Sequence, residues 1–468
     1  MRLTHALFIA TVIVTSASAA RAEEADTVQL PQEWMHYSSE GQTAEPGSRQ
    51  WWTRFEDPML DSLIDLGLRN NYDVRMATRR IAMARAAVGS ARAGYYPVIG
   101  VNAGYTATHT AGATSSPAGP SEKLNYFGLS ATMSWEIDIF GRVKANVDAG
   151  KRQLDISRAE RAGIEVSLAA EIATTYINLR VQQAQLAVAR QHSESQHKAL
   201  KIAEARFETG LASMMDVDQA RQVYYSTIAS VPVLESNIHN DITSLATLLG
   251  VAPGEVSGTL SVPREMPSYI QLVAAGVPAD LLRNRPDVIE AEKEIELYAT
   301  KLGIARKDWL PTLSLQASAG TEAHSARKLF GDGSFTYTVA PTLSWTVFDG
   351  FARKYNIVSA REQLHSAVDN YNFTLLTAVQ EADNALSTYF SYVKYIKALD
   401  DVVGAAKEYD FRALDNYKNG LSPYINVANA QMSYLEDMNT LIVAKGNALN
   451  ALVSLYKAIG GGWTDEEM

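Results

Sequence analysis

The sequence predicts an α+β membrane protein, in which the strands of a β-barrel lead into very long helices, and three observations support this fold class. The chain carries an internal repeat, and each half contains two strands that are apolar on one face and small or polar on the other. Each half then runs into a proline-free segment that would form a helix of roughly 100 Å at ~1.5 Å per residue.

Composition excludes several classes of protein. In 468 residues, 47% are hydrophobic and 20% are charged, which excludes a disordered chain and a multi-helix inner-membrane transporter. The net charge is -10, and the chain lacks the excess of basic residues that a nucleic-acid binder carries, so no nucleic acid is expected as a partner. The chain has no cysteine, which removes disulfides, thiolate nucleophiles, cysteine-based zinc sites and a lipidated N-terminal cysteine.

The first 22 residues are typical of a secretory signal peptide. A basic start at Arg2 precedes an apolar run from Ala6 to Val14, and small residues permit cleavage after Ala22 or Ala19. The apolar run falls short of the ~20 residues that a spanning helix needs, and no later stretch reaches that length. An exported chain without a spanning helix is soluble or enters the outer membrane as a barrel.

The internal repeat keeps a nearly constant register. The segment 68–74 recurs at 282–288 with an offset of 214 residues, while Ser134-Trp135 matches Ser344-Trp345 with an offset of 210. The glycines Gly210 and Gly420 also match at 210, so the change in offset fits a difference in loop length. A single register across these landmarks indicates a duplicated chain.

Each repeat is expected to contain a helix, two strands, a very long helix, a tight turn and a return helix. Outside the repeats lie an arm over 23–64, a connector over 251–278 and a tail over 462–468. In the first repeat, 65–250, the strands are expected over about 98–109 and 124–139, the long helix over about 142–209 and the return helix over about 213–249. In the second repeat, 279–461, the strands are expected over about 312–321 and 335–348, with helices over about 352–419 and 424–459.

The strands indicate lipid on one side and water on the other. Residues from Phe127 to Ile137 alternate between an apolar face and a face of Gly, Ser, Thr and Glu, and residues 337–347 do the same. A strand packed on the core of a soluble sandwich would show a similar alternation. Trp135 and Trp345 suit either a membrane interface or a core.

The long helices favour packing along their length. From Leu364 to Ile396 the apolar residues recur at a mean spacing near 3.5, the period of a coiled coil. Two strands per repeat give four per chain, too few to close a barrel, and a strand edge cannot face lipid. The barrel must therefore be assembled from several chains.

Several motifs together resemble the outer-membrane factors, the TolC-like outer-membrane components of bacterial efflux systems, and most of all the branch that serves resistance-nodulation-division pumps. They are Trp51-Trp52, Asp57-Pro58, residues 138–142, 278–287, 348–350 and 455–461. The resemblance implies a homotrimer with a twelve-stranded outer-membrane barrel, four strands per chain, and a helical barrel in the periplasm. It also implies a passive exit duct, a periplasmic adaptor and an inner-membrane pump as partners. Many members of this branch carry a lipidated cysteine, which this chain lacks, so the barrel alone is expected to anchor it.

The resemblance places a gate at the two helix turns, where partner docking opens the periplasmic entrance. Asp216 matches the lock carboxylate and Tyr417 the lock tyrosine, while a supporting arginine aligns with Ser422. Acidic ring positions align with Asn426 and Asn429, so cation selectivity is weakened unless Asp216 and Asp218 face the lumen; Ile425 would add an apolar constriction. The tips expected to contact the adaptor are Gly210, Leu211, Ala212, Ser213, Gly420, Leu421 and Ser422.

No enzymatic, cofactor or metal site is expected. His192 and His197 lie five residues apart, do not share a helical face and have no third ligand, so they are interpreted as a solvated pair. Two other functions remain open, namely a non-conducting periplasmic coiled-coil scaffold and an exit duct for type I protein secretion. The exported substrates are not indicated by the sequence.

Overall fold

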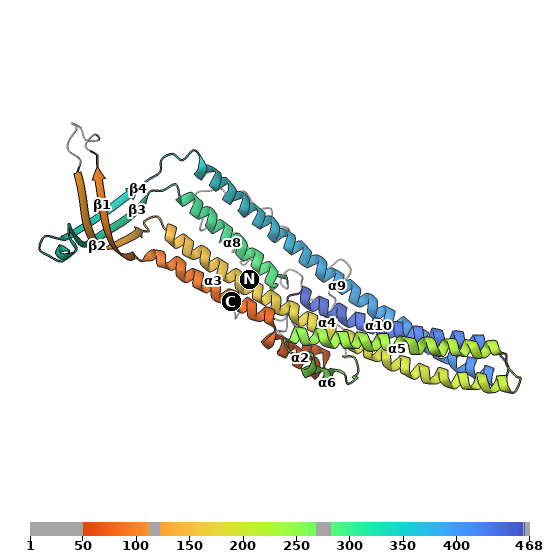
Figure 1. Ribbon diagram of the computed structural model, residues 1–468. Helices are drawn as coiled ribbons and strands as arrows, with labels where there is room; N and C mark the ends of the chain where they lie inside the picture. Colours follow the sequence, from red (N-terminus) through yellow and green to blue (C-terminus); the bar gives the residue numbers. More distant parts are fainter. Residues whose placement is uncertain (1–49, 112–121, 268–281, 462, 464–468) are drawn as a thin grey trace, which may run out of the picture. The chain divides into compact units, whose positions relative to one another are not determined.

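The computed structural model describes residues 50–111, 122–267, 282–461 and 463 (Figure 1). The predicted signal peptide, most of the predicted arm, the loop 112–121, and parts of the connector and tail lie outside the described residues. The chain divides into two compact units. The first comprises the described parts of 1–78, 159–289 and 371–468, and the second comprises 79–158 and 290–370.

The first unit is helical. Its short elements are η1 (Trp51–Phe55), α2 (Pro58–Asn70) and α6 (Pro253–Leu260), and its long ones are α5 (Met214–Leu249), α10 (Tyr424–Ala458) and the greater parts of α4 (Arg142–Glu208) and α9 (Ala352–Lys418). The helices α4 and α9 have 67 residues each, or roughly 100 Å at ~1.5 Å per residue. Their apolar positions bury one face against the return helices, which agrees with the coiled-coil spacing of the sequence.

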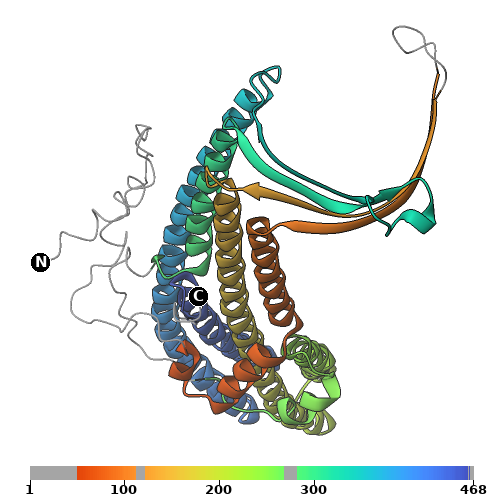
Figure 2. The same ribbon diagram turned by 90° about the vertical axis from the view of Figure 1, so that its left-hand side faces the viewer.

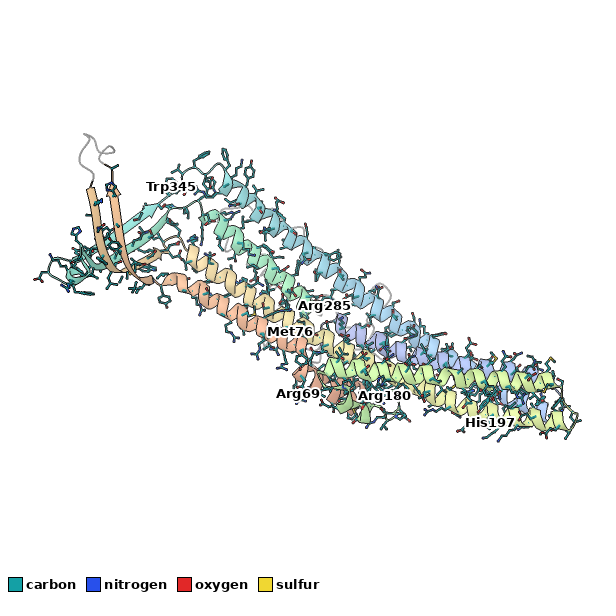
Figure 3. All side chains as sticks on the ribbon, viewed as in Figure 1. Arg69, Met76, Arg180, His197, Arg285 and Trp345 are labelled. Carbon is teal, nitrogen blue, oxygen red and sulfur yellow. The ribbon has the colours of Figure 1, made fainter. Side chains whose placement is uncertain are left out.

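A buried polar network fixes the N-terminal segment and the connector to the helices. Asp57 caps α2 by accepting the backbone N–H of Met59 at 2.9 Å, and its other oxygen accepts the hydroxyl of Tyr176 at 2.6 Å. The guanidinium of Arg180, a residue labelled in Figure 3, lies over the Tyr176 ring. It also donates to the Val262 carbonyl at 3.0 Å. The main apolar core, which includes Trp51 stacked on Tyr456, surrounds this network.

The second unit holds one antiparallel sheet in the order β1-β2-β3-β4. Its strands are β1 (Val98–Thr110), β2 (Glu122–Ile137), β3 (Thr312–Ala323) and β4 (Phe335–Ser344), drawn as a curved layer in Figure 2. The unit also contains most of α3 (Tyr72–Arg92) and α8 (Pro286–Lys307) and the first turns of α4 and α9. The strand β4 ends at Ser344, four residues before the end expected from the alternation.

The two halves of the chain repeat the same contacts. The indole of Trp135 donates to the Tyr95 carbonyl at 3.1 Å, and the indole of Trp345 donates to the Trp309 carbonyl at 3.0 Å. Both tryptophans thus fasten the end of a strand to the turn that follows a helix. Trp345 is 60% exposed in the single chain, so it is not a core residue of this unit.

The ends of the return helices are held in the same repeated manner. Asn71 donates to the Leu248 carbonyl at 2.9 Å, and Arg285, at the matching position of the second half, donates to the Ala458 carbonyl at 2.7 Å. Arg285 also donates to the carboxylates of Asp287 at 2.7 Å and Glu381 at 2.8 Å. A buried arginine needs carboxylate partners to balance its charge, whereas an asparagine is neutral and needs none.

Candidate functional site

The register of the sheet puts apolar residues of all four strands on one face. Ala131 pairs with Val101 on β1 and with Ala319 on β3, and Ala319 pairs with Tyr337 on β4. One residue further along, Thr132 pairs with Gly100 and Ser318, and Ser318 pairs with Thr338. Paired residues of antiparallel strands share a face, so the sheet has an apolar face and a face of small and polar residues.

The apolar face is open in the single chain. Large side chains on β1 and β4 are exposed by half or more: Val101, Tyr105, Phe335, Tyr337, Val339 and Leu343. Monomeric soluble proteins rarely expose an apolar patch that runs across a whole sheet. Within the described residues, β1 pairs with β2 alone and β4 pairs with β3 alone, so both outer edges present unpaired backbone groups.

The two predicted helix turns have the same backbone structure. Gly210 and Gly420 adopt φ values of +74° and +75°, the left-handed region that glycine enters without strain. The N–H of Leu211 reaches the Arg206 carbonyl at 2.7 Å, and the N–H of Leu421 reaches the Asn416 carbonyl at 2.9 Å. This pattern is the Schellman motif, which ends a helix sharply and lets the chain return alongside it.

Four helices share one core beside these turns. Small residues of α4 and α5, such as Ala203 and Ala220, pack against Tyr417 of α9 and Tyr424 of α10. The two tyrosine rings meet edge to face, with centroids 5.1 Å apart, and both hydroxyls are buried without a hydrogen-bond partner among the residues that the structure describes. Burial raises the pKa of Tyr424 and also that of Tyr417. Two unpaired buried hydroxyls lower stability, and each gains free energy if it finds a partner.

The predicted lock pair lies at this core. Asp216 is in the first turn of α5, where its backbone N–H bonds the capping Ser213, and its side chain is half-buried. Burial raises the pKa of Tyr417, and the Asp216 carboxylate raises it further, while Arg206 opposes the rise. No hydrogen bond joins Tyr417 and Asp216 within the described chain. The phenol–carboxylate lock therefore stays a prediction for the assembled protein.

The predicted constriction residues are exposed in the single chain. Ile425 is 42% exposed, and the amides of Asn426 and Asn429 also face outward. Asn426 donates to the Ser422 hydroxyl at 2.8 Å, so Ser422, with which the resemblance aligns a supporting arginine, forms a hydrogen bond within its own turn. Asp218 lies 3.7 Å from Arg221, one turn further along α5.

Sequence reasoning did not identify Arg206, which lies at the end of α4. Its guanidinium donates to the Lys418 carbonyl at 2.9 Å and to the Leu211 carbonyl at 3.4 Å, and it lies over the Tyr417 ring at 5.1 Å. The Arg206 side chain thus connects the first turn to the end of α9, next to the second turn. The repeat carried a signal, because the position that matches Arg206 is Asn416, and an unequal pair at equivalent sites indicates unequal roles.

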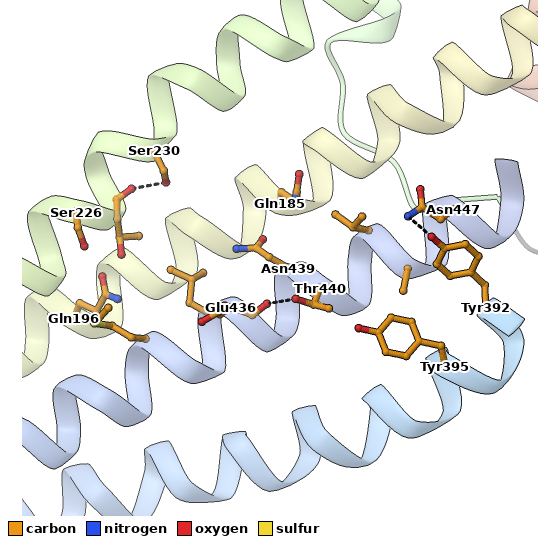
Figure 4. Close-up of a pocket in the computed structure, with 15 residues that line it drawn as sticks. Gln185, Gln196, Ser226, Ser230, Tyr392, Tyr395, Glu436, Asn439, Thr440 and Asn447 are labelled. Carbon is orange, nitrogen blue, oxygen red and sulfur yellow. Dashed lines mark hydrogen bonds between the residues drawn. The ribbon is translucent and has the colours of Figure 1, made fainter. Parts of the chain in front are cut away.

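A cavity of about 640 Å³, lined by both polar and apolar side chains, lies between α4, α5, α9 and α10, as Figure 4 shows. Gln196 is only 1% exposed, and both polar atoms of its amide lack a partner within the described chain.

The helix α5 is poorly packed beside this cavity. Its buried residues stop at Thr227 and resume at Ile242, and Pro232 lies between them. A proline inside a helix removes one backbone hydrogen bond, so α5 is weakest where it is least packed.

The prediction of a solvated histidine pair is wrong for His192. The residue is 8% exposed, its ring centroid lies 4.8 Å from that of Tyr434, and burial lowers its pKa. His197 stacks on Tyr224 instead, with 5.1 Å between the ring centroids. The helix α4 has α5 and α10 as neighbours. Because the two histidines lie five residues apart on α4, His192 faces α10 and His197 faces α5. The described residues contain no cluster of three or more His, Asp or Glu side chains that could bind a metal ion.

In the part of the chain that is described, every helix is too short or too polar to cross a membrane.

Comparison with known proteins gives one consistent result. The chain is similar to the solvent efflux pump outer membrane protein SrpC of Pseudomonas putida, with 30% identity over 430 residues that cover 90% of this chain and 88% of that protein. It is 27% identical to nodulation protein T of Rhizobium leguminosarum bv. trifolii over 88% of both chains. Among solved structures, the outer-membrane channel OprN has a TM-score of 0.84 at 26% identity, covering 89% of this chain and 93% of that one. The outer membrane protein VceC of Vibrio cholerae has a TM-score of 0.81 at 25% identity, covering 89% and 100%.

The structural neighbours are outer-membrane channels that are mostly helical with a small antiparallel sheet, as this chain is. The family model for outer membrane efflux proteins matches residues 63–251 and 277–461, which are the greater part of both halves. The family consists of efflux channels, and its members are not enzymes. The predicted resemblance is confirmed, and the chain belongs to the outer membrane efflux protein family.

Proposed function

We propose that this protein is the outer-membrane exit channel of a tripartite efflux system and that it conducts small molecules passively. One observation carries the proposal: the four-stranded sheet has a continuous apolar face, an opposite polar face and two open edges. An apolar face suits lipid, and a face of small and polar residues suits a water-filled pore.

The open edges support an assembly of several chains. Backbone groups left unpaired in lipid cost several kcal/mol each, so β1 of one copy is expected to pair with β4 of the next. Three copies would give a barrel of twelve strands, as the family resemblance implies. The protein would then function as a homotrimer.

The repeated contacts support an internal duplication. Trp135 and Trp345 fasten equivalent strand ends, and Asn71 and Arg285 hold equivalent helix ends. We infer that the repeat boundaries lie near 65–250 and 279–461, with a connector between them. Each repeat would supply two strands and one pair of long helices to the channel.

The two helix turns are proposed as the periplasmic entrance. Tyr417 lies in the core that the four helices share, the Asp216 carboxylate is near enough to raise its pKa, and the buried tyrosine hydroxyls are available for new partners. Docking of a periplasmic adaptor at the tips, residues 210–213 and 420–422, would open the entrance. The exposed side chains of Asp218, Ile425, Asn426 and Asn429 are candidates for the pore constriction.

Relatives indicate the class of partner and cargo. SrpC is named as part of a solvent efflux pump, and a protein of Pseudomonas putida that is 28% identical is named as part of an antibiotic efflux pump. We propose a resistance-nodulation-division pump as the inner-membrane partner and drugs or solvents as cargo. The channel itself would select little among them, because the pump would determine the substrate.

Expression in cells that lack their own outer-membrane efflux channel tests this proposal. The expected result is that the protein fractionates with the outer membrane, extracts in detergent as a trimer and restores resistance to drugs or solvents when its pump and adaptor are co-expressed. Recovery of a water-soluble monomer in the periplasm would instead support the scaffold alternative and overturn the channel proposal.

A further inference from the structure

We propose that Arg206 is a positioning residue that clamps the two helix turns of one protomer together and holds the entrance closed. The proposal rests on the proposed channel function and adds to it a contact within a single chain. It concerns how the turns are held to each other, whatever contacts form between protomers.

The contacts of Arg206 join two helix pairs. One guanidinium nitrogen, Nη1, donates to the carbonyl of Lys418 at 2.9 Å, and Nη2 donates to the carbonyl of Leu211 at 3.4 Å. Lys418 is the last residue of α9, whereas Leu211 belongs to the turn that follows α4. Within the described residues 199–223 and 410–430, the bond to Lys418 is the one hydrogen bond that crosses from the α4–α5 pair to the α9–α10 pair.

The chemistry of the acceptors suits an arginine. The last carbonyls of a helix have no partner inside the helix and carry the negative end of its dipole, so a cation there is stabilising. The planar guanidinium can serve two carbonyls and an aromatic face at once, which a lysine ammonium cannot do with fixed geometry. The Tyr417 ring supplies that face, with 5.1 Å between its centroid and the guanidinium carbon.

The guanidinium packs directly against the second turn. A Cβ atom at Gly420 would lie 3.4 Å from Nη2 of Arg206, which is an ordinary van der Waals contact. The matching position in the second half, Asn416, makes no reciprocal hydrogen bond to the first turn among the described residues. The hydrogen-bonded link between the turns therefore depends on one side chain from the first half, in addition to the apolar core that the four helices share.

The clamp also positions the predicted lock tyrosine. Tyr417 lies between the guanidinium on its face and Tyr424 at its edge, and the Asp216 carboxylate is near enough to act on it. Separation of the two helix pairs would remove Arg206 from Lys418 and free Tyr417 to move. We therefore expect opening of the entrance to require release of Arg206.

The test compares Arg206→Ala and Arg206→Lys with a matched control, Arg221→Ala. Arg221 bonds Glu204 at 3.1 Å, close to the same turn, but this pair joins α4 to α5 within one helix pair. Loss of a charged hydrogen bond that holds the closed state is expected to raise the open fraction in planar bilayers about tenfold. Arg206→Lys should give a smaller rise, and Arg221→Ala should match wild type.

A second readout reports the separation of the turns directly. The chain has no cysteine, so spin labels can be placed at Leu211→Cys and Leu421→Cys, whose side chains are both exposed in the turns. Pulsed electron resonance on the trimer should show a longer and broader distance in Arg206→Ala than in wild type, with the control unchanged.

The two readouts separate failure of the clamp from failure of channel function. If every variant conducts like wild type and the label distances are also unchanged in a folded trimer, the clamp is overturned. An equal effect of Arg221→Ala would overturn it as well. If no variant conducts at all, widened distances in Arg206→Ala or Arg206→Lys still support the clamp, while the conduction claim falls.

Discussion

An arginine in place of Val339 should destabilise the inserted protein, whereas an arginine one residue earlier should not. Val339 lies near the middle of β4, on the apolar face, and is 63% exposed in the single chain. Its neighbour Thr338 is also exposed but pairs with Ser318 on the polar face. An arginine facing lipid at the bilayer midplane costs about 2 to 4 kcal/mol per chain. Thr338→Arg should cost little, because its side chain would face water.

The assay is urea unfolding of the protein in lipid vesicles, with the folded fraction followed by tryptophan fluorescence and by protection from protease. A loss of about 2 to 4 kcal/mol corresponds to a folding equilibrium roughly thirty to several hundred times weaker. The expected order is wild type close to Thr338→Arg, with Val339→Arg well below both. Equal losses in the two variants would refute the assignment of the faces, and a larger loss in Thr338→Arg would reverse it.

Three further predictions concern the helical unit and can be checked by thermal unfolding in detergent. Tyr176→Phe removes the 2.6 Å hydrogen bond to Asp57 and should cost about 1.5 to 3 kcal/mol, while Asp57→Asn, which also weakens the cap of α2, should cost more. Burial raises the pKa of Asp241 to about 6, above its unfolded value, so its ionisation opposes folding and stability should fall as pH rises from about 4 to 6. Asp241→Asn should remove this dependence and stabilise the protein by about 1 to 2 kcal/mol at pH 7, allowing for solvent screening; an unchanged pH profile would refute the assignment. Pro232→Ala should restore a backbone hydrogen bond in α5 and raise the midpoint, and no change would show that α5 is not weakened there.

The two faces of the sheet were predictable because each strand carries its own alternation of apolar and polar residues. Alternation over 127–137 and 337–347 specifies two faces whatever the partner strand, and the register of the structure joins those faces across all four strands. The turns were equally predictable, because a glycine that follows a long apolar-periodic segment commonly ends a helix. The premature end of β4 at Ser344 was missed because residues 345–347 continue the alternation without forming ladder pairs.

The contacts between distant segments could not be predicted from periodicity. Arg206 meets Lys418 across 212 positions of sequence, and only the packing of two helix pairs brings them together. His192 was misread for a related reason, because a spacing of five residues shows that two side chains diverge but not what each then meets. The cavity around Gln196 depends on side chains from four helices at once, which no periodicity within a single helix reveals.

The central claim, that the protein is a channel, is tested most directly by planar-bilayer conductance of the detergent-extracted trimer under a salt gradient. We predict small, long-lived steps with weak cation preference, and a stronger preference when Asn426→Asp and Asn429→Asp are combined, because the added carboxylates would line the constriction. A trimer that inserts but shows no steps, even when Arg206→Ala releases the turns, would contradict the account.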